Sequence, residues 1–216
     1  MPVRSAELAR TVPLQIVIIA GSQRPGSQSR RLAEQIQGRS ASRRPDVEAR
    51  IVSLVDAKVP MWDPEFMSDS DLWRDSFGGI ERKFRSASGF IFVVPEYGGM
   101  APPILKNLFL LDRNHIFAHK PALIVAISEG LGGAYPIAEL RMSSYKNTRI
   151  CWIPHHVIVR RVSQFTAATD EAPKANLPQA WTRIDHACDV LFAYSTALQG
   201  MRSSANVDLS LFPNGM

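Results

Sequence analysis

The sequence predicts an α/β fold, in which five parallel strands in the order 2-1-3-4-5 form a doubly wound sheet with helices on both faces. Two observations lead to this prediction. Short apolar blocks rich in β-branched residues alternate along the chain with blocks of helical spacing, which is the pattern of successive β-α units. Several of the apolar blocks are uninterrupted, as expected of parallel strands that are buried on both faces.

The first β-α-β unit is predicted from three blocks. Residues 14–20 (LQIVIIA) form a continuous apolar run, which indicates a strand buried on both faces. Residues 29–40 carry apolar side chains three and four positions apart, which predicts a helix. Residues 47–55 alternate more loosely, which indicates a strand at the edge of the sheet.

The next stretch is expected to return to the centre of the sheet. Residues 58–68, with two prolines and two large aromatic side chains, are predicted to be an irregular loop. Residues 69–86 are predicted to be a helix that Gly78 and Gly79 weaken. Residues 89–95 (GFIFVVP) form a second fully buried strand.

The remaining elements repeat the same order. A helix is expected over residues 102–112, which begin with prolines at the first turn. A buried strand over 120–128 is followed by a helix from about 136 to 146. A strand over 150–159 and a long helix over 181–201 complete the predicted fold.

Composition limits the possible classes of protein. The chain has 216 residues, 45% of them hydrophobic and 21% charged, which suffices for one domain with its own core. We divide it into an N-terminal extension (1–13), one domain (14–201) and a C-terminal tail (202–216). The formal net charge of +5 favours anionic small molecules and is low for a dedicated nucleic-acid binder.

The sequence shows no sign of a metal centre, a targeting segment or a membrane span. Cys151 and Cys188 lack the spacing of a zinc or iron–sulfur site, and we expect both thiols to be free in a reducing compartment. The apolar run 14–20 is interpreted as a strand rather than a signal peptide, and no run approaches the roughly 18–20 residues that cross a bilayer. We therefore expect a cytoplasmic protein.

Other clusters of side chains are interpreted as structural. His155 and His156 are adjacent on a strand and face opposite sides, so they cannot share a metal ion in the usual way. His115 and His119 lie in a predicted loop, and no metal site is expected there. A basic cluster near a helix end has no aromatic stacking motif and is not expected to bind nucleic acid. Its members are Arg39, Arg43 and Arg44.

Three loops follow predicted buried strands and should lie at the same edge of the sheet. The first, residues 21–29, feeds a helix N-terminus with small donors and one arginine, a chemically sensible cradle for a phosphate. It matches neither a Walker loop nor a dinucleotide fingerprint. The alternative is that Ser29 only caps the helix and the other serines face solvent.

The second and third loops offer flat backbone. Residues 95–107 place Tyr97 beside two glycines, which lets backbone approach a planar ligand, or else forms a simple turn with Tyr97 covering the next helix. Residues 128–134 contain three glycines, which permit a close approach but also suit a tight strand-to-helix turn. Taken together, a phosphate cradle and two flat surfaces fit a phosphate joined to a planar ring, as in FMN.

The motifs in these loops resemble those of a known family. They are G-S-x-R-x-x-S-x-S at residues 21–29, P-E-Y-x-x-x-x-P-x-x-L-K-N at 95–107 and the glycine loop at 130–133. With them the chain resembles the NADPH-dependent FMN reductase family from about residue 14 to 159. The resemblance implies a flavodoxin-like fold, non-covalent FMN as cofactor and NADPH or NADH as co-substrate. It also implies transfer of electrons to flavins, quinones, azo compounds or similar acceptors, and a homodimer or homotetramer.

The resemblance also implies where FMN is held. The phosphate would be bound by residues of the first loop, namely Ser22, Arg24, Ser27, Gln28 and Ser29. The ribityl chain and the isoalloxazine would be lined by the second loop, at Pro95, Glu96, Tyr97 and Gly98. The pyrimidine end would be approached by Ser128, Gly130 and Gly132.

Three positions depart from the family pattern. The family often has Asn and Ser where this chain has Gly98 and Met100, so that side-chain polar contacts are lost and backbone contacts remain. Glu129 stands where a small residue is common. If its carboxylate faced the flavin, it would oppose the negative charge that builds up on reduction, and FMN affinity or redox potential should fall.

The expected mechanism needs no protein acid or base, because hydride transfer is the chemistry of the cofactor. We therefore name no catalytic residue, and expect ping-pong kinetics with one shared site. Two alternatives remain: a flavodoxin-like electron carrier without NAD(P)H activity, and a fold that has lost its flavin. Trp62 and Phe66 are expected to pack in the core or an interface, the alternative being a cap on a neighbouring subunit's flavin.

Overall fold

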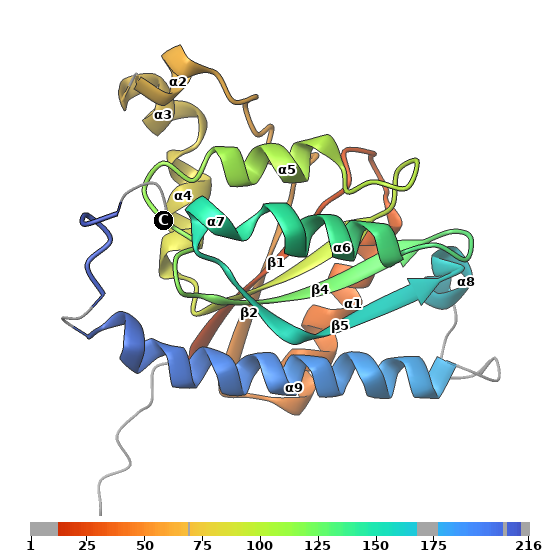
Figure 1. Ribbon diagram of the computed structural model, residues 1–216. Helices are drawn as coiled ribbons and strands as arrows, with labels where there is room; N and C mark the ends of the chain where they lie inside the picture. Colours follow the sequence, from red (N-terminus) through yellow and green to blue (C-terminus); the bar gives the residue numbers. More distant parts are fainter. Residues whose placement is uncertain (1–12, 69, 168–176, 205–206, 213–216) are drawn as a thin grey trace, which may run out of the picture.

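The computed structural model describes residues 13–68, 70–167, 177–204 and 207–212. Within them, five parallel strands form one sheet in the order β2-β1-β3-β4-β5 (Figure 1). The strands are β1 (Leu14–Ala20), β2 (Val47–Ser53), β3 (Gly89–Pro95), β4 (Pro121–Ser128) and β5 (Cys151–Arg160). The predicted fold class and strand order are confirmed, and the N-terminal extension lies outside the described residues except for residue 13.

Helices cover both faces of the sheet (Figure 1). On one face lie α1 (Gln28–Arg43), α8 (Val162–Ala167) and α9 (Leu177–Arg202). The other face is covered by α2 (Pro64–Ser68), α3 (Ser70–Ser76), α4 (Gly78–Ser86), α5 (Pro103–Leu110), α6 (Ala134–Ser143) and α7 (Tyr145–Thr148). No described helix is long and apolar enough to cross a membrane.

The sheet separates two hydrophobic cores. Alternate residues of β3 enter opposite cores: Phe90 and Phe92 pack with α4 and α5, whereas Ile91 and Val93 pack with α1 and α9. Every residue of β3 is buried, which explains why its sequence is continuously apolar. At the edge, β2 exposes part of its length, as its looser pattern predicted.

Two differences from the predicted elements lie between β2 and β3. The prediction of an irregular loop over 58–68 is wrong at its end, where α2 forms. Oδ1 of Asp63 accepts a hydrogen bond from the N–H of Glu65 at 2.8 Å, and Pro64 is the first helical residue, so a capping signal was present but not used. The single helix predicted over 69–86 is two helices, because the helix is interrupted at the fully buried Phe77, just before the glycine pair.

Two further differences lie in the second half. The helix predicted over 136–146 is divided into α6 and α7, and Arg149 ends α7 in the left-handed region at φ +53°. The short helix α8 after β5 was not predicted. It is held by contacts with other elements, since its Thr166 carbonyl accepts a hydrogen bond from Nε2 of Gln35 on α1 at 3.0 Å.

Candidate functional site

The loop between β1 and α1 gathers hydroxyl groups at a helix N-terminus. Ser22 and Ser29 are 2% and 0% exposed. Ser27 caps α1 by accepting a hydrogen bond from the N–H of Arg30, and its Oγ lies 3.0 Å from that of Ser29. Gly26 precedes the cap at φ +62°, a conformation that suits glycine. Because the first N–H groups of a helix have no partner within it, this cluster can receive an anion.

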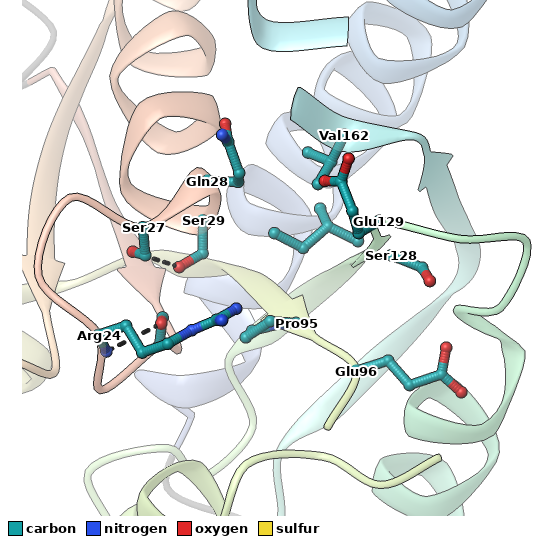
Figure 2. Close-up of a pocket in the computed structure, with 11 residues that line it drawn as sticks. Arg24, Ser27, Gln28, Ser29, Pro95, Glu96, Ser128, Glu129 and Val162 are labelled. Atoms are coloured by element: carbon teal, nitrogen blue, oxygen red, sulfur yellow. Dashed lines mark hydrogen bonds between the residues drawn. The ribbon is translucent and has the colours of Figure 1, made fainter. Parts of the chain in front are cut away.

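Arg24 and Tyr97 connect this loop to the loop that follows β3. The guanidinium of Arg24 lies 5.2 Å from the centre of the Tyr97 ring, within the range of a cation–π contact. The Tyr97 hydroxyl is 2.7 Å from Oγ of Ser22, which also accepts a hydrogen bond from the backbone N–H of Arg24. In Figure 2 the Arg24 side chain extends toward Pro95, so that a formal positive charge lies between the two loops.

The loop after β3 is a tight turn. The N–H of Tyr97 donates to the carbonyl of Met100 at 2.9 Å, and the N–H of Met100 donates back at 3.0 Å. Gly98 and Gly99 have φ of +56° and +79°, as in a type I′ turn, which glycine and asparagine favour. Gly98 therefore keeps the turn that an Asn would make. Among the described residues, the N–H groups of Gly98 and Gly99 donate to no protein acceptor.

Glu96 organises the glycine loop rather than facing the serines. Its carboxylate accepts a hydrogen bond from the N–H of Gly133, at the start of α6. An acidic group stabilises this end of a helix. The carboxylate packs so closely on Gly132 that a β-carbon there would lie 2.0 Å from Oε2. Figure 2 shows the Glu96 carboxylate directed toward α6 and away from Ser27 and Ser29.

Glu129 is held by α8. Its carboxylate accepts hydrogen bonds from the backbone N–H of Ser163, at 3.2 Å, and from the Ser163 hydroxyl. In Figure 2 the carboxylate lies beside Val162, the first residue of α8. Donors from α8 therefore stabilise the charge of Glu129. The departure from the family pattern at this position does not leave the carboxylate without hydrogen-bond donors beside the serines of the first loop.

These loops enclose a cavity of about 90 Å³ at the carboxyl ends of the strands. It is lined by most of the predicted site residues, namely Ser22, Arg24, Ser27, Gln28, Ser29, Pro95, Glu96 and Ser128. The other predicted residues belong to the same loops but do not line it; they are Tyr97, Gly98, Gly130 and Gly132. Ile127, Glu129 and Val162 also line it. Sequence reasoning could not find Val162, because α8 was not expected.

Gln28 faces both the cavity and α8. Its amide oxygen accepts a hydrogen bond from the hydroxyl of Thr166 at 2.6 Å. This bond leaves the amide NH₂ as the group that can donate to a ligand. Gln28 therefore keeps donor capacity while its orientation is fixed by a helix that lies far away in the sequence.

The donor set fits the phosphate end of FMN. Three serine hydroxyls, one guanidinium and a helix N-terminus are the groups that bind phosphate esters in proteins. Beyond the cavity, three exposed apolar side chains form what we call the apolar rim: Met100, Leu131 and Tyr135 are 53%, 71% and 71% exposed. A β-carbon on Gly99 would lie 3.7 Å from the Tyr135 ring, which places the turn beside the rim. An apolar surface of this kind suits a planar ring.

Other residues that the sequence singled out have structural partners. Phe66 is buried against Trp73, with ring centroids 5.2 Å apart, whereas Trp62 is 46% exposed. The basic cluster joins α1 to its surroundings. Arg39 and Arg43 bond to Asp185 of α9, and Arg44 bonds to Asp46. This pairing agrees with the structural interpretation of the cluster.

Neither the histidines nor the thiols form a metal site in the described part of the chain, where no suitable group of ligands is found. His155 packs against His186, with ring centroids 5.3 Å apart. Cys151 and Cys188 are both free thiols. Burial raises the pKa of Cys188 to about 12, so this thiol is uncharged at neutral pH.

Comparisons with known proteins agree with this geometry. The model of a family described as NADPH-dependent FMN reductase matches residues 14–164. No curated protein sequence matches the chain. Among solved structures, the flavoenzyme NAD(P)H:(acceptor) oxidoreductase FerB from Paracoccus denitrificans is similar with a TM-score of 0.61 and 17% identity, over 85% of this chain and 98% of FerB.

Two further solved structures are similar in fold. The NADH:FMN oxidoreductase EMOB, in its apo form, has a TM-score of 0.59 and 21% identity, over 81% of this chain and 88% of that one. An azoreductase from Bacillus anthracis strain Sterne has a TM-score of 0.57 and 11% identity, over 83% and 99% of the two chains.

Proposed function

The chain belongs to the NADPH-dependent FMN reductase family, and from this premise we propose how it works as an NAD(P)H-dependent flavin oxidoreductase. It is an enzyme of flavodoxin-like fold that uses FMN and NAD(P)H. We propose that the cavity at the carboxyl ends of β1, β3 and β4 holds the FMN phosphate. The observation that carries this proposal is the meeting of two buried hydroxyls, Ser22 and Ser29, with the Arg24 guanidinium at the N-terminus of α1.

The protein's part in the reaction is binding and orientation. When bound, FMN supplies the hydride chemistry, accepting electrons from the nicotinamide and passing them to the acceptor. Arg24, Ser22, Ser27, Gln28 and Ser29 would hold the phosphate. The turn 97–100 would place the free N–H groups of its glycines against the ring system.

Glu96 would act as a positioning residue, since it fixes the glycine loop through Gly133. Ser128, Gly130 and Gly132 would then approach the pyrimidine end of the ring. Ser128 already orders its own loop, because its Oγ accepts a hydrogen bond from the N–H of Gly130 at 3.2 Å.

We propose a ping-pong mechanism in which the nicotinamide and the acceptor use the same face in turn. The apolar rim of Met100, Leu131 and Tyr135 offers exposed apolar side chains on the loops beside the cavity and at the start of α6. Such a surface makes few directional contacts, which fits a broad range of planar acceptors such as flavins, quinones and azo compounds. Parallel lines in double-reciprocal plots, with NADPH and a quinone varied, are the expected kinetic result; intersecting lines would contradict a ping-pong mechanism.

We also propose a homodimer or homotetramer in the cytoplasm. Exposed apolar side chains on α5, α6 and α7 favour a subunit interface on that face. They include Leu110, Met142 and Tyr145, which are 60%, 76% and 50% exposed. The two free thiols favour a reducing compartment. Sedimentation of the wild type and of Met142→Glu tests the interface, and a monomeric wild type would contradict it.

The absorption spectrum of the purified protein tests the central proposal. Flavin bands on addition of FMN, bleached by NADPH without oxygen, are the expected result. Flavin bands that NADPH leaves unchanged would favour an electron carrier instead. A protein that does not bind added FMN would overturn the assignment of the cavity and favour a fold that has lost its flavin.

A further inference from the structure

A second cavity lies at the opposite end of the strands from the candidate flavin site, near the amino ends of β4 and β5. It measures about 290 Å³. Five of the side chains that line it are basic or imidazole groups; they are Arg85, His115, His119, Lys120 and Arg202. We call it the basic cavity. None of these residues belongs to the loops that form the candidate flavin site.

Arg149 adds a further cation beside the basic cavity. Its Nη1 lies 3.3 Å from Nδ1 of His115. Since a guanidinium can only donate, this contact makes Nδ1 an acceptor and His115 a neutral imidazole. Arg149 also donates to the carbonyl of Phe212, in the segment that follows α9. In Figure 1 this segment rises from the end of α9 toward α4 and α7.

Backbone carbonyls are the described partners of two of these cations. Nη1 of Arg202 donates to the carbonyl of His119 at 3.2 Å, and Nζ of Lys120 donates to the carbonyls of Phe84 and Arg85 at 2.7 and 2.9 Å. In the part of the chain that the structure describes, Arg149, Arg202 and Lys120 make no ion pair within 4.0 Å.

Three acidic groups near the basic cavity leave much of this charge uncompensated. Asp208 is exposed and accepts hydrogen bonds from Ser210. Glu81 accepts a hydrogen bond from Arg85 at 2.7 Å. Asp112 is largely buried, and burial raises its pKa to about 7, so that its negative charge is only partial at neutral pH.

Burial, together with neighbouring positive charges, lowers the pKa values of the titratable groups at the basic cavity. Burial and the positive charge of Arg149 lower the pKa of His115, and burial with Arg149 and Arg202 lowers that of His119. Burial, Arg202 and Arg85 lower the pKa of Lys120 to about 7, against a smaller opposing effect of Asp112. A bound anion would relieve the repulsion between these positive charges and restore the charged forms.

The backbone at the basic cavity is also held in an unusual conformation. His115, His119 and Arg149 have φ of +52°, +56° and +53°. Non-glycine residues rarely adopt this left-handed region, and such strain tends to gather at functional sites. Arg149 takes this conformation where α7 ends, and His115 and His119 take it in the turns before β4, so the backbone that carries these side chains is fixed.

We propose that the basic cavity binds a phosphate group, as the free ion or as the ester of a small metabolite. The arginines provide fork-shaped donors that match phosphate oxygens. The remaining wall is apolar, formed by Ile116, Ala118, Val207 and Leu209. This wall has room for a small apolar group attached to the phosphate. The site is separate from the flavin phosphate site, at the other end of the strands.

Calorimetric titration of the FMN-saturated protein with inorganic phosphate, in a phosphate-free buffer of low salt, tests the proposal. Saturation with FMN keeps phosphate away from the β1 loop; if no FMN binds, Arg24→Gln serves the same purpose. One site per chain is expected. Arg202→Gln and Arg149→Gln should each weaken binding at least tenfold, while Arg202→Lys keeps most of it.

Arg50→Gln is the matched control. Arg50 lies on β2, at the other edge of the sheet, and pairs with Glu48 at 2.7 Å, so the variant removes the same charge elsewhere. Thermal unfolding without phosphate shows whether each variant is folded, and phosphate should raise the wild-type melting temperature more than that of Arg202→Gln. No saturable binding to the wild type, or equal weakening by Arg50→Gln, would overturn the proposal.

A titration with phenyl phosphate separates the two sources of the phosphate group. Tighter binding than that of inorganic phosphate would assign the site to esters that use the apolar wall. Equal affinity would assign it to the free ion.

Discussion

A β-carbon on Gly132 would stand 2.0 Å from Oε2 of Glu96. Real β-carbons do not approach an oxygen so closely, so one of the two groups would have to move. The Glu96 carboxylate is in turn held by the N–H of Gly133 at the start of α6. The Glu96 side chain therefore couples the glycine loop to the turn after β3.

Gly132→Ala should lower the free energy of unfolding by about 1 kcal/mol, because the new methyl group displaces the half-buried Glu96 carboxylate from its hydrogen bond with Gly133. Denaturant unfolding measures this change. Gly130→Ala is the matched control, since the nearest atom to its β-carbon is 4.0 Å away. If the contact is the cause, the double variant Gly132→Ala with Glu96→Ala should lose less than the sum of the two single changes.

Arg24→Gln should weaken FMN binding by roughly 10- to 100-fold, the usual value of one charge-assisted hydrogen bond. Quenching of flavin fluorescence measures the affinity. Riboflavin, which lacks the phosphate, should bind the variant and the wild type equally. Arg31→Gln removes the same charge from an exposed position on α1 and should change little. Equal losses for FMN and riboflavin would show that Arg24 does not contact the phosphate.

Asn107 is predicted to hold the segment after β2. It is 3% exposed, its Nδ2 donates to the carbonyl of Pro60 at 2.8 Å, and its Oδ1 accepts from the N–H of Trp62 at 2.7 Å. Asn107→Ala leaves both backbone groups without partners, so we expect a loss of about 1–3 kcal/mol in unfolding free energy. Asn107→Asp should keep the bond to Trp62 but place a buried carboxylate oxygen against the Pro60 carbonyl, so its loss should be at least as large. An unchanged melting temperature for Asn107→Ala would contradict this role.

Asp112 makes stability depend on pH. Burial raises its pKa from 3.8 to about 7 in the folded protein. The folded state thus holds the proton more tightly than the unfolded state, and the stability gained from it is present below pH 3.8 and lost as the pH rises toward 7. Asp112→Asn, which does not titrate, should therefore gain stability relative to the wild type between pH 4 and pH 7. Denaturant unfolding at pH 5 and pH 7 checks the sign, and a constant difference would contradict it.

The sequence predicted the sheet well because each strand carries its own local signal. The bounds of β1 and β3 agree with the predicted 14–20 and 89–95, since β3 is buried along its whole length and β1 from Ile16 to Ala20, so these residues must be apolar. Short helices were harder to predict. A six-residue helix such as α8 has too few residues for a periodic pattern, and it is stabilised by contacts with α1 and the loop after β4.

The sequence by itself determined the fold class, the strand order and the three loops that meet at one edge, because these follow from local hydrophobic patterns and from short motifs. Only the tertiary structure decided where the charges in those loops point. Glu129 could have faced the flavin or not, and Ser163, 34 positions away, holds its carboxylate. The basic cavity depends in the same way on residues from α4, α7, α9 and the segment before β4. Hydrogen bonds and Coulomb interactions act over a few ångströms in space, whatever the separation along the chain, so no local pattern records them.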